Sequence, residues 1–179
     1  MRFPVVEARI AGACYVLTTI FGATAFSVSN PKVGDTLNFI AALFYIAVTL
    51  LLYRLFRAVS TGLSAFAALF SLIGCGLQLL DTFNVNPLHV NNIIFFGVYC
   101  ILIALLLTRA SFLPHWLSAF MALAGISWLT YLSRSLGREL SSYTFLTGLL
   151  GEGALTLWLL IKGVDASRWR EQALTSRQA

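Results

Sequence analysis

The chain has 179 residues, of which 59% are hydrophobic and 11% are charged. A soluble domain carries roughly 25% charged residues, so this composition excludes an ordinary soluble fold. Together with a mean hydropathy of +0.84, it indicates an integral membrane protein that contacts the lipid bilayer. The net charge of +5 comes from cations at the ends of apolar runs, with no basic stripe interleaved with aromatic residues, so we expect no nucleic-acid partner.

Six apolar segments follow one another along the chain, each near the roughly 20 residues that cross ~30 Å of hydrocarbon as a helix. They span residues 8–28, 37–57, 61–82, 90–109, 114–135 and 142–163. They predict an all-α fold, a polytopic transmembrane helical bundle of six helices, formed by a single domain over residues 1–164. Residues 165–179 are expected to form a short tail with an interfacial helix, capped by Asp165 and anchored by Trp169.

The first segment resembles a signal peptide in part. Arg2 and Arg9 precede an apolar run, and Ala23-Thr24-Ala25 resembles a cleavage site. The run is nevertheless long enough to span a membrane, so we expect it to be a retained helix.

Two pairs of segments share sequence at corresponding positions. Residues 50–54 and 105–109 are three leucines followed by one residue and an arginine, and residues 63–69 and 117–123 both begin Leu-Ser-Ala-Phe. The pattern suggests a parallel repeat of helices two and three with helices four and five, two hairpins of the same orientation. The alternative is coincidence among common membrane residues.

The distribution of Lys and Arg predicts the orientation, because cytoplasmic flanks carry an excess of these residues. With six spans, both termini share one side. That side holds Arg2, Arg9, Arg54, Arg57, Arg109, Lys162, Arg168, Arg170 and Arg177, whereas the other holds Lys32, Arg134 and Arg138. We therefore expect cytoplasmic N- and C-termini.

Glu152 is the main candidate for a functional residue because it lies in the middle of the last apolar segment. A carboxylate at that depth costs roughly 2.5–3.5 kcal/mol on insertion scales, so it must face the interior, find donors or be protonated. A spacing of four places Thr144, Gly148 and Thr156 on the same helix face. Glu152 is then either a contact for a cation, proton or ligand, or a hydrogen-bonding residue that locks helix packing.

Further polar residues are expected toward the outer side of the membrane. Ser127, Tyr131 and Arg134 share one face of the fifth segment at i, i+4 and i+7. These groups predict an outward-facing cavity with Glu152 at its floor; the alternative is ordinary interfacial residues, with Asp81 paired to an arginine. The candidate ligand-binding residues are Glu152, Thr156, Gln78, Asp81, His89, Asn92, Tyr99, Tyr131 and Arg134.

The sequence predicts no metal site and no cofactor. His89 is expected at the outer interface and His115 at the inner one, so both cannot bind one haem iron. A zinc site of His89, Asp81 and Glu152 would need Glu152 about two helical turns higher than its expected depth. No Ser-His-Asp arrangement and no glycine-rich phosphate loop is present. The cysteines lie in apolar runs and form no Cys-x-x-Cys pair, which leaves their redox state open: Cys14, Cys75 and Cys100.

Four stretches of the chain together carry a family resemblance. They are Arg9-Ile10-Ala11-Gly12, the sequence FFGVYC at 95–100, RASFLP at 109–114 and GEGALTLWLLIKGV at 151–164. With them the chain resembles, over nearly its whole length, the bacterial multi-pass membrane family called domain of unknown function 4386. The resemblance implies a six- or seven-helix bacterial inner-membrane protein in which Gly151, Glu152 and His89 are recurring features. It carries over no activity.

Three functions remain in competition. The first is binding or transport of a small molecule, lipid-like ligand or ion through a bundle cavity, with Glu152 as the intramembrane contact and a small apolar or amphiphilic ligand as partner. The second is a non-catalytic assembly or partner protein in which Glu152 only fixes packing. The third is a lipid- or quinone-modifying enzyme that uses Asp81, His89 and Arg134; a non-enzymatic role is favoured. The oligomeric state stays open.

Overall fold

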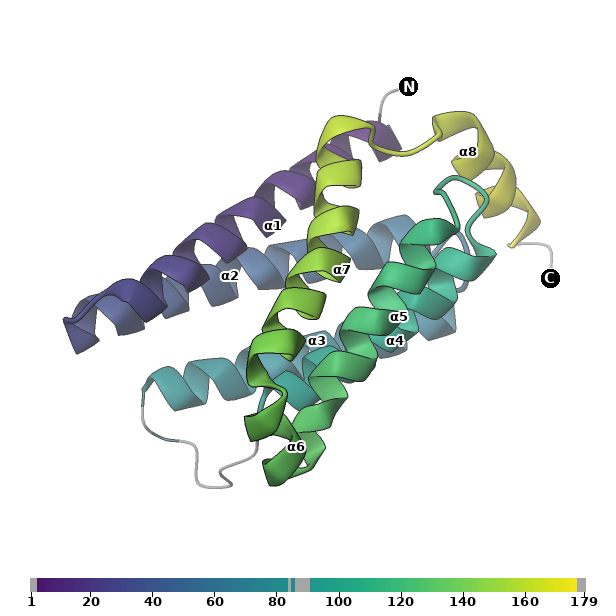
Figure 1. Cartoon of the computed structure of the whole chain (residues 1–179). Coiled ribbons are helices and arrows are strands. Elements are labelled where there is room, and N and C mark those ends of the chain that lie inside the picture. The colour runs from purple at the N-terminus through teal and green to yellow at the C-terminus, as the bar shows by residue number, and fades with distance from the viewer. Residues whose placement is uncertain (1–2, 84, 86–90, 177–179) are drawn as a thin grey trace.

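The computed structural model describes residues 3–83, 85 and 91–176, without the side chains of Phe3 and Arg134. Within this part the regular structure is helical throughout (Figure 1). The helices are α1 (Phe3–Ser27), α2 (Pro31–Phe56), α3 (Thr61–Thr82), α4 (Ile93–Arg109), α5 (Trp116–Leu129), a 3₁₀ turn η1 (Thr130–Leu132), α6 (Arg134–Glu139), α7 (Ser141–Ile161) and α8 (Ala166–Thr175).

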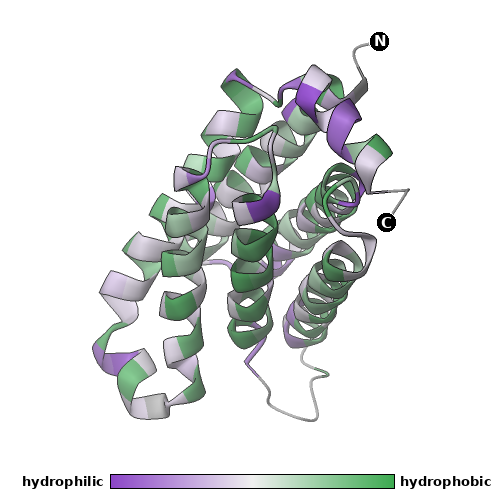
Figure 2. Cartoon of the chain, turned by 90° about the vertical axis from the view of Figure 1, so that its right-hand side faces the viewer, coloured by the Kyte–Doolittle hydropathy of each residue, from purple (hydrophilic) through white to green (hydrophobic). Residues whose placement is uncertain are grey.

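The predicted all-α membrane bundle is confirmed. The helices α1, α2, α3 and α7 are long and apolar enough to cross a bilayer, whereas α4 has 17 residues and α5 has 14. Large apolar side chains also cover the outward faces of the helices, including Ile20 (54% exposed) and Leu157 (55% exposed). Such a surface is unfavourable in water and favourable in lipid. Figure 2 shows hydrophobic residues along the middle of the long helices and hydrophilic residues concentrated near their ends and on α8.

The long helices form a ring in chain order. Each packs mainly against its neighbours in the sequence, and α7 closes the ring by packing against both α5 and α1. The α2–α3 and α4–α5 turns lie at the same end of the molecule, next to α8 and near both termini (Figure 1). The two hairpins therefore have the same orientation, as a parallel repeat requires.

Short polar motifs start the helices where the sequence turns. The side chain of Asn30 accepts a hydrogen bond from the backbone N–H of Lys32, and Pro31 begins α2. Pro lacks an N–H group and so costs little at this position. Ser60 caps α3 by accepting from the N–H of Leu63. At the other end of the chain, Gly163 has a φ of 72°, which favours glycine, and follows the end of α7.

The fifth segment is interrupted, contrary to the predicted continuous helix over 114–135. It ends at Leu129, continues as η1, and passes through the extended residue Ser133 before α6 begins. The prediction that Ser127, Tyr131 and Arg134 share one α-helical face is therefore wrong. A helical face requires an unbroken 3.6-residue period, and the 3₁₀ turn breaks it.

Helix α8 lies in the tail, and Asp165 caps its first turn. The Asp165 carboxylate accepts hydrogen bonds from the N–H groups of Ser167 and Arg168. Hydrogen bonds from Ser167 and Arg168 hold the pKa of this exposed carboxyl below its usual range. The Trp169 indole donates to the carbonyl oxygen of Leu55 at 2.9 Å, so this tryptophan anchors α8 to the end of α2.

Candidate functional site

The Glu152 carboxylate lies inside the ring and accepts hydrogen bonds from side chains of three other helices. Its Oε2 accepts from the Tyr15 hydroxyl of α1 at 3.1 Å. Its Oε1 accepts from the Trp128 indole N–H of α5 at 3.0 Å and from the Cys100 thiol of α4 at 3.5 Å. The residue is partly buried. Glu152 therefore connects α7 to α1, α4 and α5 at one point.

Aromatic side chains extend this cluster across the ring. The Tyr15 hydroxyl lies 3.2 Å from the Tyr45 hydroxyl of α2, and the two rings meet edge to face with centroids 5.4 Å apart. Tyr45 also packs edge to face against Tyr99 and Phe96 of α4. Tyr15 and Tyr99 are almost completely buried. The ring interior is thus an aromatic core around one carboxylate.

Glycines on α7 provide the space in which this cluster forms. A Cβ atom at Gly148 would overlap the indole of Trp128, whose N–H group reaches Glu152 one turn further along α7. A Cβ atom at Gly151 would overlap the Phe120 carbonyl oxygen and the Ala124 side chain. The two glycines therefore let α5 approach α7 closely, as small residues do in membrane bundles.

A third glycine brings α1 to α7. A Cβ atom at Gly12 would lie 2.7 Å from the backbone nitrogen of Leu160, so the two helices are in backbone contact there. Tyr15, one turn along α1, then reaches Glu152. The close helix contacts at Gly12 and Gly148 thus bring Tyr15 and Trp128 within hydrogen-bonding distance of the Glu152 carboxylate.

The donors to Glu152 are all formally neutral. Among the described side chains, the ion pairs are Arg54–Glu7 at 2.6 Å and Arg168–Asp165 at 3.6 Å, so no described cation neutralises Glu152. Hydrogen bonds to charged groups contribute about 1.5–3 kcal/mol each. The stabilisation from the hydrogen bonds that Tyr15 and Trp128 donate is therefore comparable to the ~2.5–3.5 kcal/mol cost of a carboxylate at mid-membrane. The site can hold the anion without a protein cation, and it leaves a negative charge available to a ligand.

Tyr99 adds an unsatisfied polar atom beside this charge. Its hydroxyl is buried and has no hydrogen-bond partner within the described residues. Its ring packs against Tyr45, which is itself linked through Tyr15 to Glu152. A buried hydroxyl without a partner costs about 1–3 kcal/mol, so a polar group that reached it would be stabilised.

The predicted site residues fall into separate regions. Tyr99 lies in the central cluster, and Thr156 is buried one turn along α7 from Glu152. Gln78 and Asp81 lie in the last turns of α3, Asn92 immediately precedes α4 and Tyr131 belongs to η1, all toward the opposite end from α8. His89 and the Arg134 side chain are outside the described residues.

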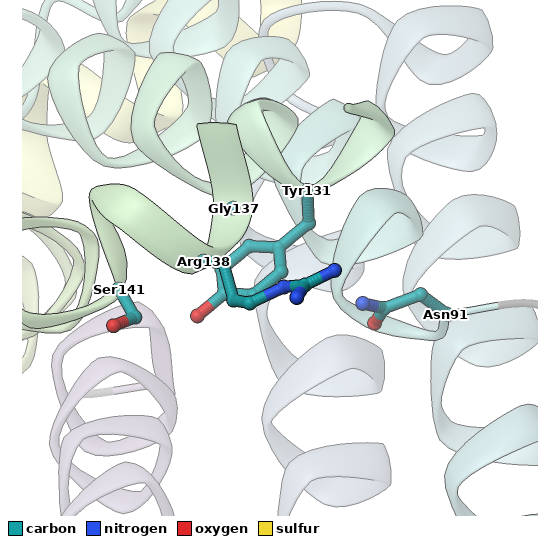
Figure 3. Close-up of a pocket in the computed structure, with 5 residues that line it drawn as sticks. All are labelled: Asn91, Tyr131, Gly137, Arg138 and Ser141. Atoms are coloured by element: carbon teal, nitrogen blue, oxygen red, sulfur yellow. The ribbon is translucent and has the colours of Figure 1, made fainter. Parts of the chain in front are cut away.

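A cavity of about 350 Å³ lies at this opposite end. Its lining residues, shown in Figure 3, are Asn91, Tyr131, Gly137, Arg138 and Ser141. Tyr131 is the predicted site residue among them. Glu152 is not among the residues that line this cavity. The cavity therefore differs from the predicted one, which had the Glu152 carboxylate at its floor.

Sequence reasoning assigned no role in the site to Tyr15, Cys100 and Trp128, which donate to Glu152. Each lies in an apolar run where its residue type is common in membrane helices. The position of Gly148 one turn before Glu152 was the available signal, since a small residue there admits a large side chain from a neighbouring helix. Which helix supplies that side chain depends on the packing order.

Comparison with known proteins supports the resemblance seen in the sequence. Residues 88–163 match the family described as Domain of unknown function (DUF4386). This segment contains α4 to α7, including Trp128 and Glu152, whereas Tyr15 and Tyr45 precede it. An uncharacterized protein of Archaeoglobus fulgidus is 28% identical over 134 residues, which cover 70% of this chain and 80% of that protein. No solved structure matches. Residues 88–163 of the chain are therefore similar to the DUF4386 family, whose function is unknown.

Proposed function

We propose that this membrane protein binds or transports a small cationic or protonatable solute within the helical ring, with Glu152 as its charged contact. The observation that carries the proposal is the partly buried carboxylate with three neutral donors and no described cation. Intramembrane ionisable residues mark ion, proton or substrate pathways by default.

The hydrogen-bond geometry allows the site to accept a proton. In the ionised state, both carboxylate oxygens of Glu152 accept, and Tyr15 is the donor to Oε2. In the protonated state, Oε2–H donates to the Tyr15 hydroxyl oxygen, and Tyr15 then donates to Tyr45 at 3.2 Å. A proton is thereby taken up at Glu152 with a reversal of both hydrogen bonds of the Tyr15 hydroxyl, the one to Glu152 and the one to Tyr45.

The buried hydroxyl of Tyr99 provides a second contact for a solute. Because it has no partner in the described structure, a ligand that carries a hydrogen-bonding group beside its positive charge would satisfy it. The surrounding rings of Tyr45 and Phe96 present apolar and π surfaces, which attract cations by about 0.5–2 kcal/mol. The site therefore favours a small amphiphilic cation over an anion or a neutral sugar.

Flux and binding measurements on reconstituted protein test the proposal. Proteoliposomes of wild type and Glu152→Gln are compared for uptake of protons, Na⁺, K⁺ and small organic ammonium ions. Glu171→Gln on the exposed face of α8 is the matched control. We expect uptake or binding in wild type and control, and its loss in Glu152→Gln. Equal behaviour of all three proteins toward every solute contradicts the proposal.

The second candidate is a non-catalytic assembly protein in which Glu152 only locks packing. It is favoured by the same hydrogen bonds, because they link four of the six ring helices at one residue. This alternative predicts that Glu152→Gln lowers the unfolding temperature or dissociates a complex while no solute binds.

The location and orientation belong to the same proposal. The positive-inside excess supports cytoplasmic N- and C-termini, and the family resemblance supports the bacterial inner membrane. The proximity of both termini at the α8 end is compatible with this orientation (Figure 1).

A further inference from the structure

The cavity at the end opposite α8 has the chemistry of an anion site. Among the described residues that line it, every polar side chain can donate a hydrogen bond and none is a carboxylate: Asn91, Tyr131, Arg138 and Ser141. In Figure 3 the Arg138 guanidinium extends toward Asn91, and the Tyr131 hydroxyl points toward the Ser141 side.

Most of the donors of this cavity have no acceptor among the described residues. The Asn91 side-chain oxygen accepts from the N–H of Ile93, which leaves its amide N–H groups for another partner. The side chains of Arg138, Tyr131 and Ser141 form no hydrogen bond or ion pair with the described residues. At this cavity of about 350 Å³, Arg138 therefore carries a positive charge that forms no ion pair with a described carboxylate.

The start of α7 adds to the positive potential of the cavity. Ser141 both begins the 21-residue helix and lines the cavity, and the N-cap residue Leu140 offers no side-chain acceptor to the first N–H groups. Free N–H groups and the helix dipole together favour an anion at such an end.

The apolar surroundings indicate where this anion comes from. Leu132, Leu136 and Leu140, the sequence neighbours of the lining residues Tyr131, Gly137 and Ser141, expose 67%, 48% and 37% of their surface. Apolar side chains that are exposed next to a cation are typical of residues at the membrane–water interface, where phospholipid headgroups lie. A phosphate in the cavity would thus be continuous with acyl chains that cover these leucines.

We propose that this cavity binds a phosphate group, held by Arg138, Tyr131, Asn91 and Ser141 and supplied by a phospholipid headgroup. Arginine binds phosphate in a bidentate geometry, with charge-assisted hydrogen bonds about twice as strong as neutral ones. The hydroxyl and amide donors complete the contacts to the remaining oxygens. The site is independent of Glu152 and of the solute proposed for the ring interior.

Binding to delipidated protein in detergent tests the site. The probes are dihexanoyl phosphatidylglycerol, dihexanoylglycerol, which lacks the phosphate, and inorganic phosphate, each titrated against wild type and followed by native mass spectrometry. We expect saturable binding of the phospholipid and binding of dihexanoylglycerol weaker by at least about tenfold, the equivalent of one charge-assisted hydrogen bond.

Variants separate the site from general surface charge. Arg138→Gln should weaken phospholipid binding by at least about tenfold, and Tyr131→Phe by a smaller factor. Lys32→Gln removes an exposed cation at the same end of the molecule and should change the affinity by less than about twofold. Unchanged binding in Arg138→Gln, or equal losses in Arg138→Gln and Lys32→Gln, overturns the proposal. Inorganic phosphate that competes at the same concentration as the phospholipid overturns the lipid source and retains the phosphate site.

Discussion

At the scale of single residues, the position of Glu152 depends on which neighbouring positions have no side chain. The Trp128 indole occupies the space above Gly148, and α1 touches α7 at Gly12. Both arrangements bring a donor to the carboxylate. The glycines are therefore as important to the site as the groups that contact Glu152 directly.

Replacement of Gly148 tests this dependence. In Gly148→Ala, the new Cβ atom would overlap the Trp128 ring, and we expect a loss of about 1–3 kcal/mol in the free energy of unfolding, typical of overpacking. Displacement of the indole from Glu152 should also change the tryptophan fluorescence. Gly153→Ala is the control, because a Cβ atom at Gly153 would have no neighbour within 4 Å. Similar stability losses in both variants would contradict this explanation.

The sequence identified some of these residues and missed others for physical reasons. Glu152 was conspicuous because a charge in an apolar run has few tolerable environments. Tyr15, Cys100 and Trp128 are ordinary membrane-helix residues, and only their three-dimensional arrangement makes them donors. Because these residue types are common in membrane helices, their presence in the sequence does not indicate which side chain they will contact.

At the scale of elements, α8 joins the two hairpins at one end of the bundle. Trp169 donates to the Leu55 carbonyl oxygen at the end of α2. Gln172 accepts from the backbone N–H of Ser111 and donates to the Arg109 carbonyl oxygen at 2.7 Å. The α4–α5 turn is thus held by side chains of the tail rather than by its own hydrogen bonds alone.

Removal of the Gln172 contacts should loosen the α4–α5 turn. In Gln172→Ala, the Ser111 N–H loses its acceptor, and a loss of about 1 kcal/mol corresponds to roughly fivefold faster local opening. Hydrogen–deuterium exchange at residues 109–113 measures this change. Glu171→Ala, which alters the exposed neighbouring residue, should leave the exchange rate unchanged. Equal rates in wild type and Gln172→Ala would show that the turn does not depend on α8.

Local patterns predicted some helix limits closely and others poorly. The predicted segment 61–82 coincides with α3, whereas α2 begins at Pro31 and not at the predicted residue 37. The break after Leu129 has no proline or glycine at the site, so nothing in the local sequence distinguished η1 and α6 from a continuing helix.

At the scale of the whole molecule, the Glu152 cluster lies inside the ring, whereas the cavity lined by Arg138 lies at the end opposite α8. The number and approximate positions of the six ring helices followed from hydropathy, although α4 and α5 are shorter than the other four. The closure of α7 on α1 did not follow, because apolar faces pack with similar energy in lipid and only residues such as Gly12 select the partner.

The orientation in the membrane can be measured with introduced cysteines. The exposed positions Ser135 and Arg170 lie at opposite ends of the bundle. We expect a membrane-impermeant maleimide to label Ser135→Cys on intact cells and Arg170→Cys only after lysis, because the positive-inside rule predicts that α8 is cytoplasmic. The wild type, with its own three cysteines, provides the background. The reverse labelling pattern would contradict the orientation.

The central claim is that Glu152 is an exchangeable contact and not only a packing residue. Labelling with dicyclohexylcarbodiimide, an apolar reagent that modifies protonated carboxyl groups, tests it most directly. We predict an adduct on Glu152 in the folded protein, identified by peptide mass spectrometry. Its yield should fall as the pH rises, and the adduct should be absent in Glu152→Gln. Labelling of Glu152 only after denaturation, with none in the folded protein at any pH, would contradict the account.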